Sequence, residues 1–157
     1  MNSSTDPGFD WGTPPTLPRT PVALQQLRLH VSLNEEHVYL SLTLSGEHQL
    51  DLGERSHHYC LLTLARHRLS DARRGVDNSG QGWVERQQLS RMLGLDTAHL
   101  NIQLHRLRQQ IARALPPGLQ LEVVERRRGE LRLGTLPFCI VRGSSFEGQF
   151  IPSRKPV

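Results

Sequence analysis

The chain has 157 residues, of which 36% are hydrophobic, and this is enough for one domain of ordinary size. It lacks a secretory signal, a cysteine-rich framework and an apolar stretch of the roughly 18 residues that a membrane span needs, so we exclude the secreted and membrane-spanning classes and expect a cytoplasmic protein. The 19 Lys and Arg residues outnumber the 15 Asp and Glu residues, and the formal charge of +4 permits an anionic partner.

The N-terminal part of the chain combines a proline-rich segment with alternating hydrophobic residues. Five prolines lie within residues 1–22, where they remove backbone donors among polar residues, so we predict a flexible leader there. Apolar and polar residues then alternate over residues 27–33 and 38–44, and a shorter run carries Leu50 and Leu52. This alternation, with short polar connections, predicts the three strands of an antiparallel meander with one solvent-exposed face.

The hydrophobic period changes to that of helices after residue 54. Apolar steps of three and four predict a helix over residues 54–72, a short helix after Val84 and a third helix that ends before Pro116. We expect Glu85 at the start of the second helix, Gly94 at its left-handed end and Asp96 as the N-cap of the third. The apolar residues of the stripes are Leu61, Leu62, Ala65, Leu69 and Ala72, then Leu89, Met92 and Leu93, then Leu100, Leu104, Leu107, Ile111 and Leu115.

Alternation resumes over residues 119–123 and 131–133, which predicts a β-hairpin with its turn at residues 127–129. Three strands, three helices and a hairpin make an α+β domain over residues 23–134. We expect residues 135–157 to form a partly ordered extension that is folded over residues 136–142, where Phe138, Ile140 and Val141 add a strand or cover the sheet, with Phe146 and Phe150 as anchors. The alternative for this extension is a partner-binding segment or a dimer clasp.

Three segments resemble parts of a known family, the winged-helix effector domains of OmpR-type bacterial response regulators. VERQQLSRMLG (84–94) is similar to the second helix of that family, LNIQLHRLRQQI (100–111) to its recognition helix, and LEVVERRRGELRLG (121–134) to its wing. The resemblance spans residues 50–133 and implies a winged helix-turn-helix that binds DNA as a transcriptional regulator. The connection before the third helix is shorter than the loop with which that family contacts RNA polymerase, so this contact is not implied.

The third predicted helix and the hairpin carry the residues that we expect to contact double-stranded DNA. If the leucine stripe is buried, the stripe that begins at His99 points outward, where Arg matches guanine and Gln matches adenine. Residues 99–132 hold seven arginines against three glutamates, a local balance of +4 that equals the charge of the whole chain. The predicted DNA contacts are His99, Asn101, Gln103, Arg106, Gln110 and Arg113 on the helix, and Arg126, Arg127, Arg128 and Arg132 on the hairpin.

The sequence offers little support for a metal-binding or catalytic site. Adjacent His57 and His58 point about 100° apart on a helix and make a poor chelating pair, and Cys60 and Cys139 form no CxxC element. We expect both cysteines to be small core residues, and we predict no metal site, cofactor or catalytic group.

Two further hypotheses remain open for the function. One is a protein-interaction winged helix in a bacterial signalling or nucleoprotein assembly, which uses the sheet or the C-terminal tail and has no need of DNA. The other is a small regulatory subunit of a larger nucleoprotein machine. A DNA-binding module of this size buries little surface, so useful affinity calls for a homodimer or a tethered partner. A polar helix face is also the ordinary solvated surface of a globular domain.

Overall fold

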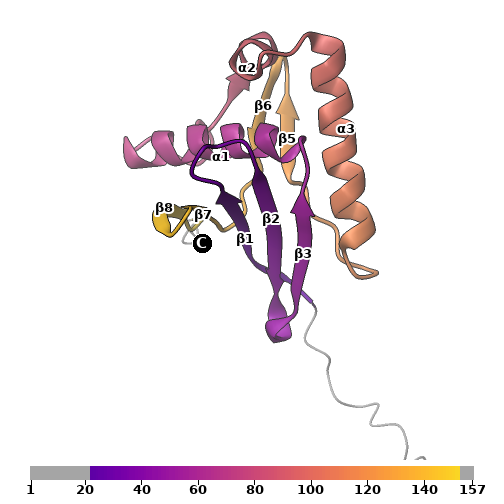
Figure 1. Cartoon of the computed structure of the whole chain (residues 1–157). Coiled ribbons are helices and arrows are strands. Elements are labelled where there is room, and N and C mark those ends of the chain that lie inside the picture. Colours follow the sequence, from indigo (N-terminus) through magenta and orange to yellow (C-terminus); the bar gives the residue numbers. More distant parts are fainter. Residues whose placement is uncertain (1–21, 153–157) are drawn as a thin grey trace, which may run out of the picture.

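The computed structural model describes residues 22–152, which form three α-helices and eight β-strands in two sheets, an α+β fold (Figure 1). The predicted leader lies outside the described residues except for Val22. No helix within residues 22–152 is long and apolar enough to cross a bilayer. In chain order the elements are β1 (Leu24–Val31), β2 (Val38–Leu44), a 3-10 turn (Ser45–Glu47), β3 (Gln49–Glu54), α1 (His58–Arg73), β4 (Val84–Glu85), α2 (Arg86–Leu93), α3 (Thr97–Ala114), β5 (Val124–Arg127), β6 (Glu130–Leu133), β7 (Phe138–Arg142) and β8 (Ser145–Phe150).

The first sheet has five strands in the order β3-β2-β1-β7-β8. The predicted meander is confirmed, because β1 pairs antiparallel with β2 and β2 with β3. Leu27, Leu29 and Val31 are buried while Arg28 and His30 between them are exposed, as the alternation predicts for one wet face.

The C-terminal segment completes this sheet, so the predicted boundary at residue 134 and a folded part limited to residues 136–142 were both wrong. β7 pairs in parallel with β1 and antiparallel with β8. Phe150 is buried and its ring stacks on Phe138 with centroids 5.2 Å apart, whereas Phe146 is 62% exposed, so the structure does not bury it as the predicted second anchor. Gly148 stands in β8 where the alternation calls for a hydrophobic side chain. Helix α1 leaves no room for one, because a Cβ at this position would lie 2.5 Å from side-chain atoms of α1.

The second sheet has the order β4-β6-β5 and joins the hairpin to the segment between α1 and α2. The predicted hairpin is present, but β5 begins at Val124 and residues 119–123 form no strand. Val123 and Val124 are both buried, so the alternation read from residue 119 does not continue into the strand. Gly134 lies against this crossing chain, since a Cβ on it would come within 2.1 Å of the Glu122 carbonyl oxygen.

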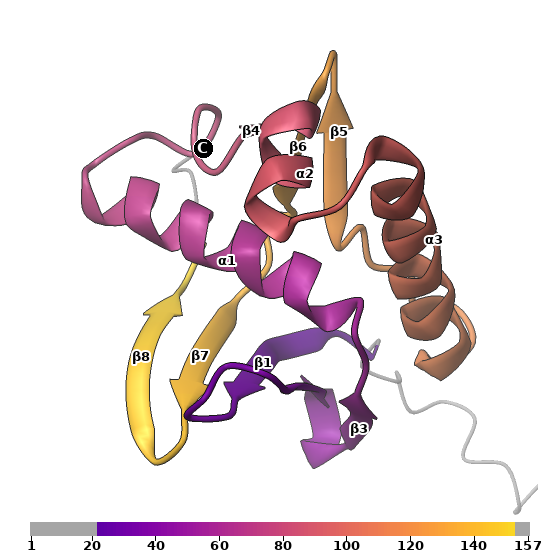
Figure 2. The same cartoon turned by 45° about the horizontal axis from the view of Figure 1, so that its top comes forward.

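The helices lie close to their predicted positions, and α1 runs between the two sheets (Figure 2). The C-cap of α2 is Gly94, whose φ of 68° and ψ of 30° are left-handed, and Glu85 is its N-cap. The N-cap of α3 is Asp96, whose Oδ1 accepts from the backbone N–H of His99 at 2.7 Å. These local signals place α2 and α3 on either side of a tight turn.

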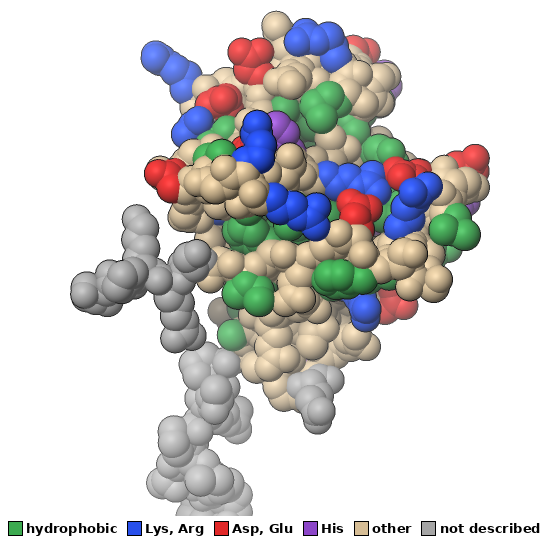
Figure 3. Space-filling view, turned by 90° about the vertical axis from the view of Figure 1, so that its left-hand side faces the viewer, with side chains coloured by type: hydrophobic (Ala, Val, Ile, Leu, Met, Phe, Trp, Pro, Cys, Tyr) green, Lys and Arg blue, Asp and Glu red, His purple; other side chains and the backbone are tan. Residues whose placement is uncertain are grey.

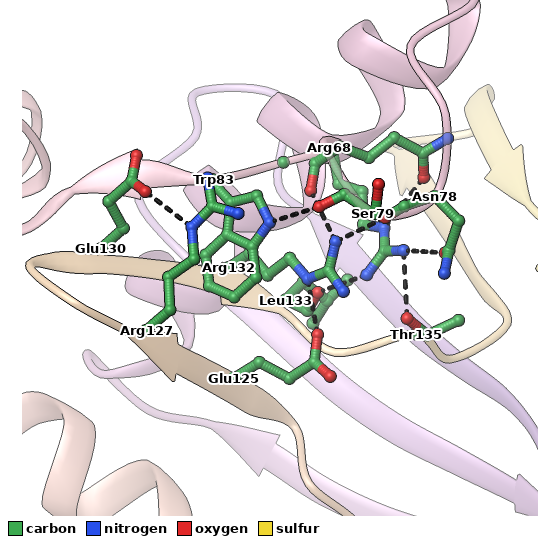
Figure 4. A network of polar contacts seen from close by, with 12 residues as sticks. Arg68, Asn78, Ser79, Trp83, Glu125, Arg127, Glu130, Arg132, Leu133 and Thr135 are labelled. Atoms are coloured by element: carbon green, nitrogen blue, oxygen red, sulfur yellow. Dashed lines mark hydrogen bonds and ion pairs between the residues drawn. The ribbon is translucent and has the colours of Figure 1, made fainter.

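Near the C-terminal end of α1, the fully buried Arg68 joins the two sheets (Figure 4). Its guanidinium has no carboxylate partner within salt-bridge distance in residues 22–152 and instead donates to neutral oxygens, while its Cζ lies 4.9 Å from the ring centroid of Phe150 in β8. Burial lowers the pKa of Arg68 to about 10, so the group stays charged at neutral pH. The acceptors are Gln81 Oε1 at 3.2 Å, the Leu133 carbonyl at 2.8 Å, Asn78 Oδ1 at 2.7 Å and Thr135 Oγ1 at 3.1 Å.

We expect the substitution Arg68→Met to lower the free energy of unfolding by about 3–5 kcal/mol, because it leaves several enclosed oxygens without a donor. Arg73→Met on the same helix is the matched control, since Arg73 is exposed and makes one bond, to the Glu147 carbonyl, so its cost is about 1 kcal/mol or less. Urea unfolding followed by circular dichroism measures both. Equal losses in the two variants would contradict a joining role for Arg68.

Candidate nucleic-acid interface

α3 buries the predicted leucine stripe and exposes the opposite side. Leu100, Leu104, Leu107 and Ile111 are buried, which confirms that part of the prediction. With about 100° between successive residues, the positions opposite this stripe are exposed, and we call them the outer strip of α3. The outer strip consists of Ile102, His105, Gln109 and Ala112.

The outward stripe predicted from the sequence is rotated about the axis of α3 by roughly one residue relative to the outer strip. As a result, the stripe includes Gln110, whose side chain points into the protein. Its Oε1 accepts from Nε2 of His57 and from Nε2 of His58, both at 2.7 Å, and its Nε2 donates to the Leu52 carbonyl at 2.8 Å. The prediction that Gln110 points outward was therefore wrong. Gln103 on the same side is half-buried, and its enclosed Oε1 accepts no hydrogen bond from any residue in the range 22–152.

The two histidines that hold Gln110 start α1 and face α3 rather than a metal. Nδ1 of the fully buried His58 lies 2.9 Å from the Val38 carbonyl oxygen, so each of its two ring nitrogens faces an oxygen atom of the protein. Burial lowers the pKa of His57, although the hydrogen bond that His57 donates to Gln110 acts in the opposite direction by favouring the charged form. This cluster therefore fixes the rotation of α3 about its axis.

At the N-terminal end of α3, His99 and Asn101 are exposed as predicted and are held by neighbours. The His99 ring nitrogen Nδ1 lies 2.9 Å from Asp96 Oδ1, and the His99 backbone and side chain hold the pKa of Asp96 below its usual range. Asn101 Oδ1 accepts from Nη1 of Arg86 at 2.6 Å, which connects α3 to the first residue of α2.

Arginines lie on both flanks of the outer strip. Arg106 and Arg113 are exposed and line a shallow hollow together with Arg55, which follows β3. On the other flank, Arg108 lies near Arg126 of β5 and Arg86 of α2. Burial and then the charges of these two arginines lower the pKa of Arg108.

The ten predicted contacts leave out the outer strip and Arg108, although in the sequence His105 and Arg108 flank the predicted stripe and could reach phosphates. Two features of the sequence indicate the whole strip. The midpoint of the leucine stripe, projected through the helix axis, falls on the outer strip. α3 also contains three arginines and no acidic residue, so each of its charged side chains carries the same sign.

The hairpin divides its four predicted DNA contacts between the two faces of its sheet. Arg126 shares the face of Val124 toward α3, whereas Arg127 and Arg132 lie on the other face, on either side of Trp83, with their Cζ atoms 4.1 and 4.4 Å from its ring (Figure 4). Arg128 is exposed at the turn.

Arg132 is a structural residue, and its assignment as a DNA contact was wrong. It is buried, its Nε donates to Glu125 at 2.5 Å, and its Nη1 donates to the carbonyls of Asn78 at 2.6 Å and Gln81 at 3.0 Å. Arg127 is half exposed and pairs with Glu130 at 2.7 Å, so its charge is largely neutralised. The predicted local charge of +4 includes these two arginines and the two glutamates that they bind, Glu130 and Glu125. Each of these ion pairs contributes no net charge.

The turn of the hairpin is attached to α2 rather than extended into solvent. The backbone N–H of Arg86 donates to the Gly129 carbonyl at 3.0 Å, and β4 pairs with β6 immediately beside the turn. The hairpin, the start of α2 and α3 thus form one continuous surface around Arg86.

The side of the molecule that carries β8 has a different distribution of charge, with basic and acidic groups next to one another (Figure 3). Here Arg66 pairs with Glu147 and Glu35 at 2.8 Å, and Arg142 lies 3.4 Å from Glu35. By contrast, no ion pair within residues 22–152 involves the arginines around α3, namely Arg55, Arg86, Arg106, Arg108, Arg113, Arg126 and Arg128.

Comparison of the chain with protein-family models, curated proteins and solved structures finds no match.

The neighbouring glutamines of α3 provide a test of its orientation. We expect Gln110→Ala to lower the free energy of unfolding by about 1–3 kcal/mol, because two histidines and the Leu52 carbonyl lose their partner. Gln109→Ala changes an exposed residue one position away and should stay within about 0.5 kcal/mol of the parent. Urea unfolding distinguishes them, and a larger loss for Gln109→Ala would mean that the helix is rotated.

Proposed function

We propose that this chain is a DNA-binding domain of the winged-helix type that regulates transcription, with α3 in the major groove. The element order α1-β4-α2-α3-β5-β6 supports the proposal, because a helix-turn-helix followed by a hairpin is the arrangement in which the second helix of the pair reads DNA. The pairing of β4 with β6 ties the hairpin to the helix pair, which suits a wing.

The observation that carries the proposal is an exposed outer strip on α3, a helix without acidic residues, between two flanks of arginines that form no ion pair within residues 22–152. In a major groove the strip meets base edges, where Gln109 suits adenine and Ile102 suits the thymine methyl group. Arg106 and Arg113 on one flank, and Arg126 beside Arg86 on the other, then lie toward the phosphates of the two strands.

A second candidate function is protein binding through the same helices. Ile102 at the N-terminal end of the outer strip is 45% exposed, and Met92 of α2 is 49% exposed. Exposed apolar side chains on adjacent helices favour a protein partner, including a second copy of the chain. This candidate predicts that an Ile102 substitution disrupts a complex while arginine substitutions leave it intact.

We expect Arg106→Ala to weaken binding to a duplex selected from a random pool by roughly 1–3 kcal/mol, through loss of a charged contact to a phosphate. Fluorescence anisotropy of labelled duplex at fixed salt measures the effect. Arg28→Ala is the matched control, because Arg28 is also exposed but lies on the open face of the first sheet. If the parent protein fails to bind any duplex at low salt, the DNA proposal is wrong and the protein-binding candidate takes its place.

The hairpin arginines should act on all DNA sequences equally. Arg126→Ala and Arg128→Ala are each expected to reduce the slope of log affinity against log salt by about 0.9, because each removes one phosphate contact. Arg132→Ala should instead destabilise the fold, since Arg132 is buried and bonded. A salt titration with random-sequence duplex tests this, and unchanged slopes for both exposed arginines would remove the hairpin from the interface.

A further inference from the structure

A groove of about 840 Å³ lies between the C-terminal half of α3 and the chain that crosses to β5. We call it the α3–β5 groove, and its volume falls in the range of about 300–1,000 Å³ typical of small-molecule sites. One wall is formed by α3 at Arg108, Ile111 and Ala112, and the other by residues 116–124 and Arg126.

Apolar and polar surface line this groove in about equal amounts, and its leucines are incompletely covered. Leu115, Leu119 and Leu121 line it and are only half-buried, so each leaves part of its side chain exposed in the groove. Ile111 and Val123 close the floor as buried residues of the core. Half-exposed leucines gathered in one hollow favour an apolar ligand group, because its binding removes their surface from water.

One wall carries a guanidinium that is partly withdrawn from water and has no bonded anion. Nη2 of Arg108 is shielded from solvent and has no hydrogen-bond partner among the described residues, a condition that is costly for a charged donor. Arg126 also lines the groove and adds a like charge, while Glu122 lines it without forming an ion pair with either arginine. These three side chains leave a local charge of +1, which a single negative charge neutralises.

We propose that the α3–β5 groove binds a monocarboxylate with an apolar chain. Its carboxylate would pair with Arg108 and Arg126, because a guanidinium binds the two carboxylate oxygens with parallel hydrogen bonds. Its chain lies against Leu115, Leu119 and Leu121. The local charge of +1 favours this head group over a doubly charged phosphate, and the site requires no DNA, so its test is independent of the DNA proposal.

Isothermal titration of the full chain with decanoate, below its micellar concentration, tests the site. We expect saturable binding of one decanoate per chain, weakened about tenfold or more by Arg108→Gln. Arg113→Gln is the matched control on the opposite flank of α3 and should bind as the parent does. Ala112→Phe keeps Arg108 but fills the groove from an exposed position on α3, and it should abolish binding even if Arg108→Gln affects folding.

Two further probes separate the head group from the chain. Decanol keeps the apolar chain without the charge, acetate keeps the charge without the chain, and both should bind at least about tenfold more weakly than decanoate. The proposal is overturned if decanoate does not saturate, or if Ala112→Phe binds it as the parent does. Equal binding of acetate or of inorganic phosphate would also overturn it, because the apolar chain would then contribute nothing.

Discussion

The buried guanidinium of Arg68 is the contact on which the arrangement of the two sheets depends. A charged group inside a protein is stable only when acceptors surround it, and Arg68 obtains them from the loop after α1, from the end of β6 and from Thr135. Phe150 of β8 adds its ring face. Because these groups come from distant parts of the chain, the second sheet and the last strand of the first sheet must meet at one end of α1.

The position of α1 in turn sets the direction in which α3 faces. His57 and His58 at its other end bind Gln110, and the leucines of α3 pack into the same core. Rotation of α3 by one residue would break these bonds and bury a polar side chain, so the outer strip is specified by the interior. The candidate recognition surface is thus a consequence of packing on the opposite side of the helix.

Arginine has two separate functions in this protein. Arg68 and Arg132 are buried and bonded, and Arg66 and Arg127 are held in ion pairs, so these side chains stabilise the fold. The arginines around α3 have no acidic partner in the described part of the chain, and their charge is available to an external anion. The basic surface around α3 therefore results from which arginines lack an acidic partner, and the net charge of the chain does not reveal this.

What the sequence by itself determined is the local structure: the meander, the three helices, the left-handed Gly94 and the Asp96 cap. These features depend on contacts between residues close in the chain, and period and capping chemistry report such contacts directly. Only the tertiary structure decided that β7 pairs in parallel with β1, that β4 joins the hairpin, and that Gln110 and Arg132 face inward while Arg108 borders a groove. Each of these depends on partners many residues away, and a polar side chain looks the same in a sequence whether water or a buried oxygen satisfies it.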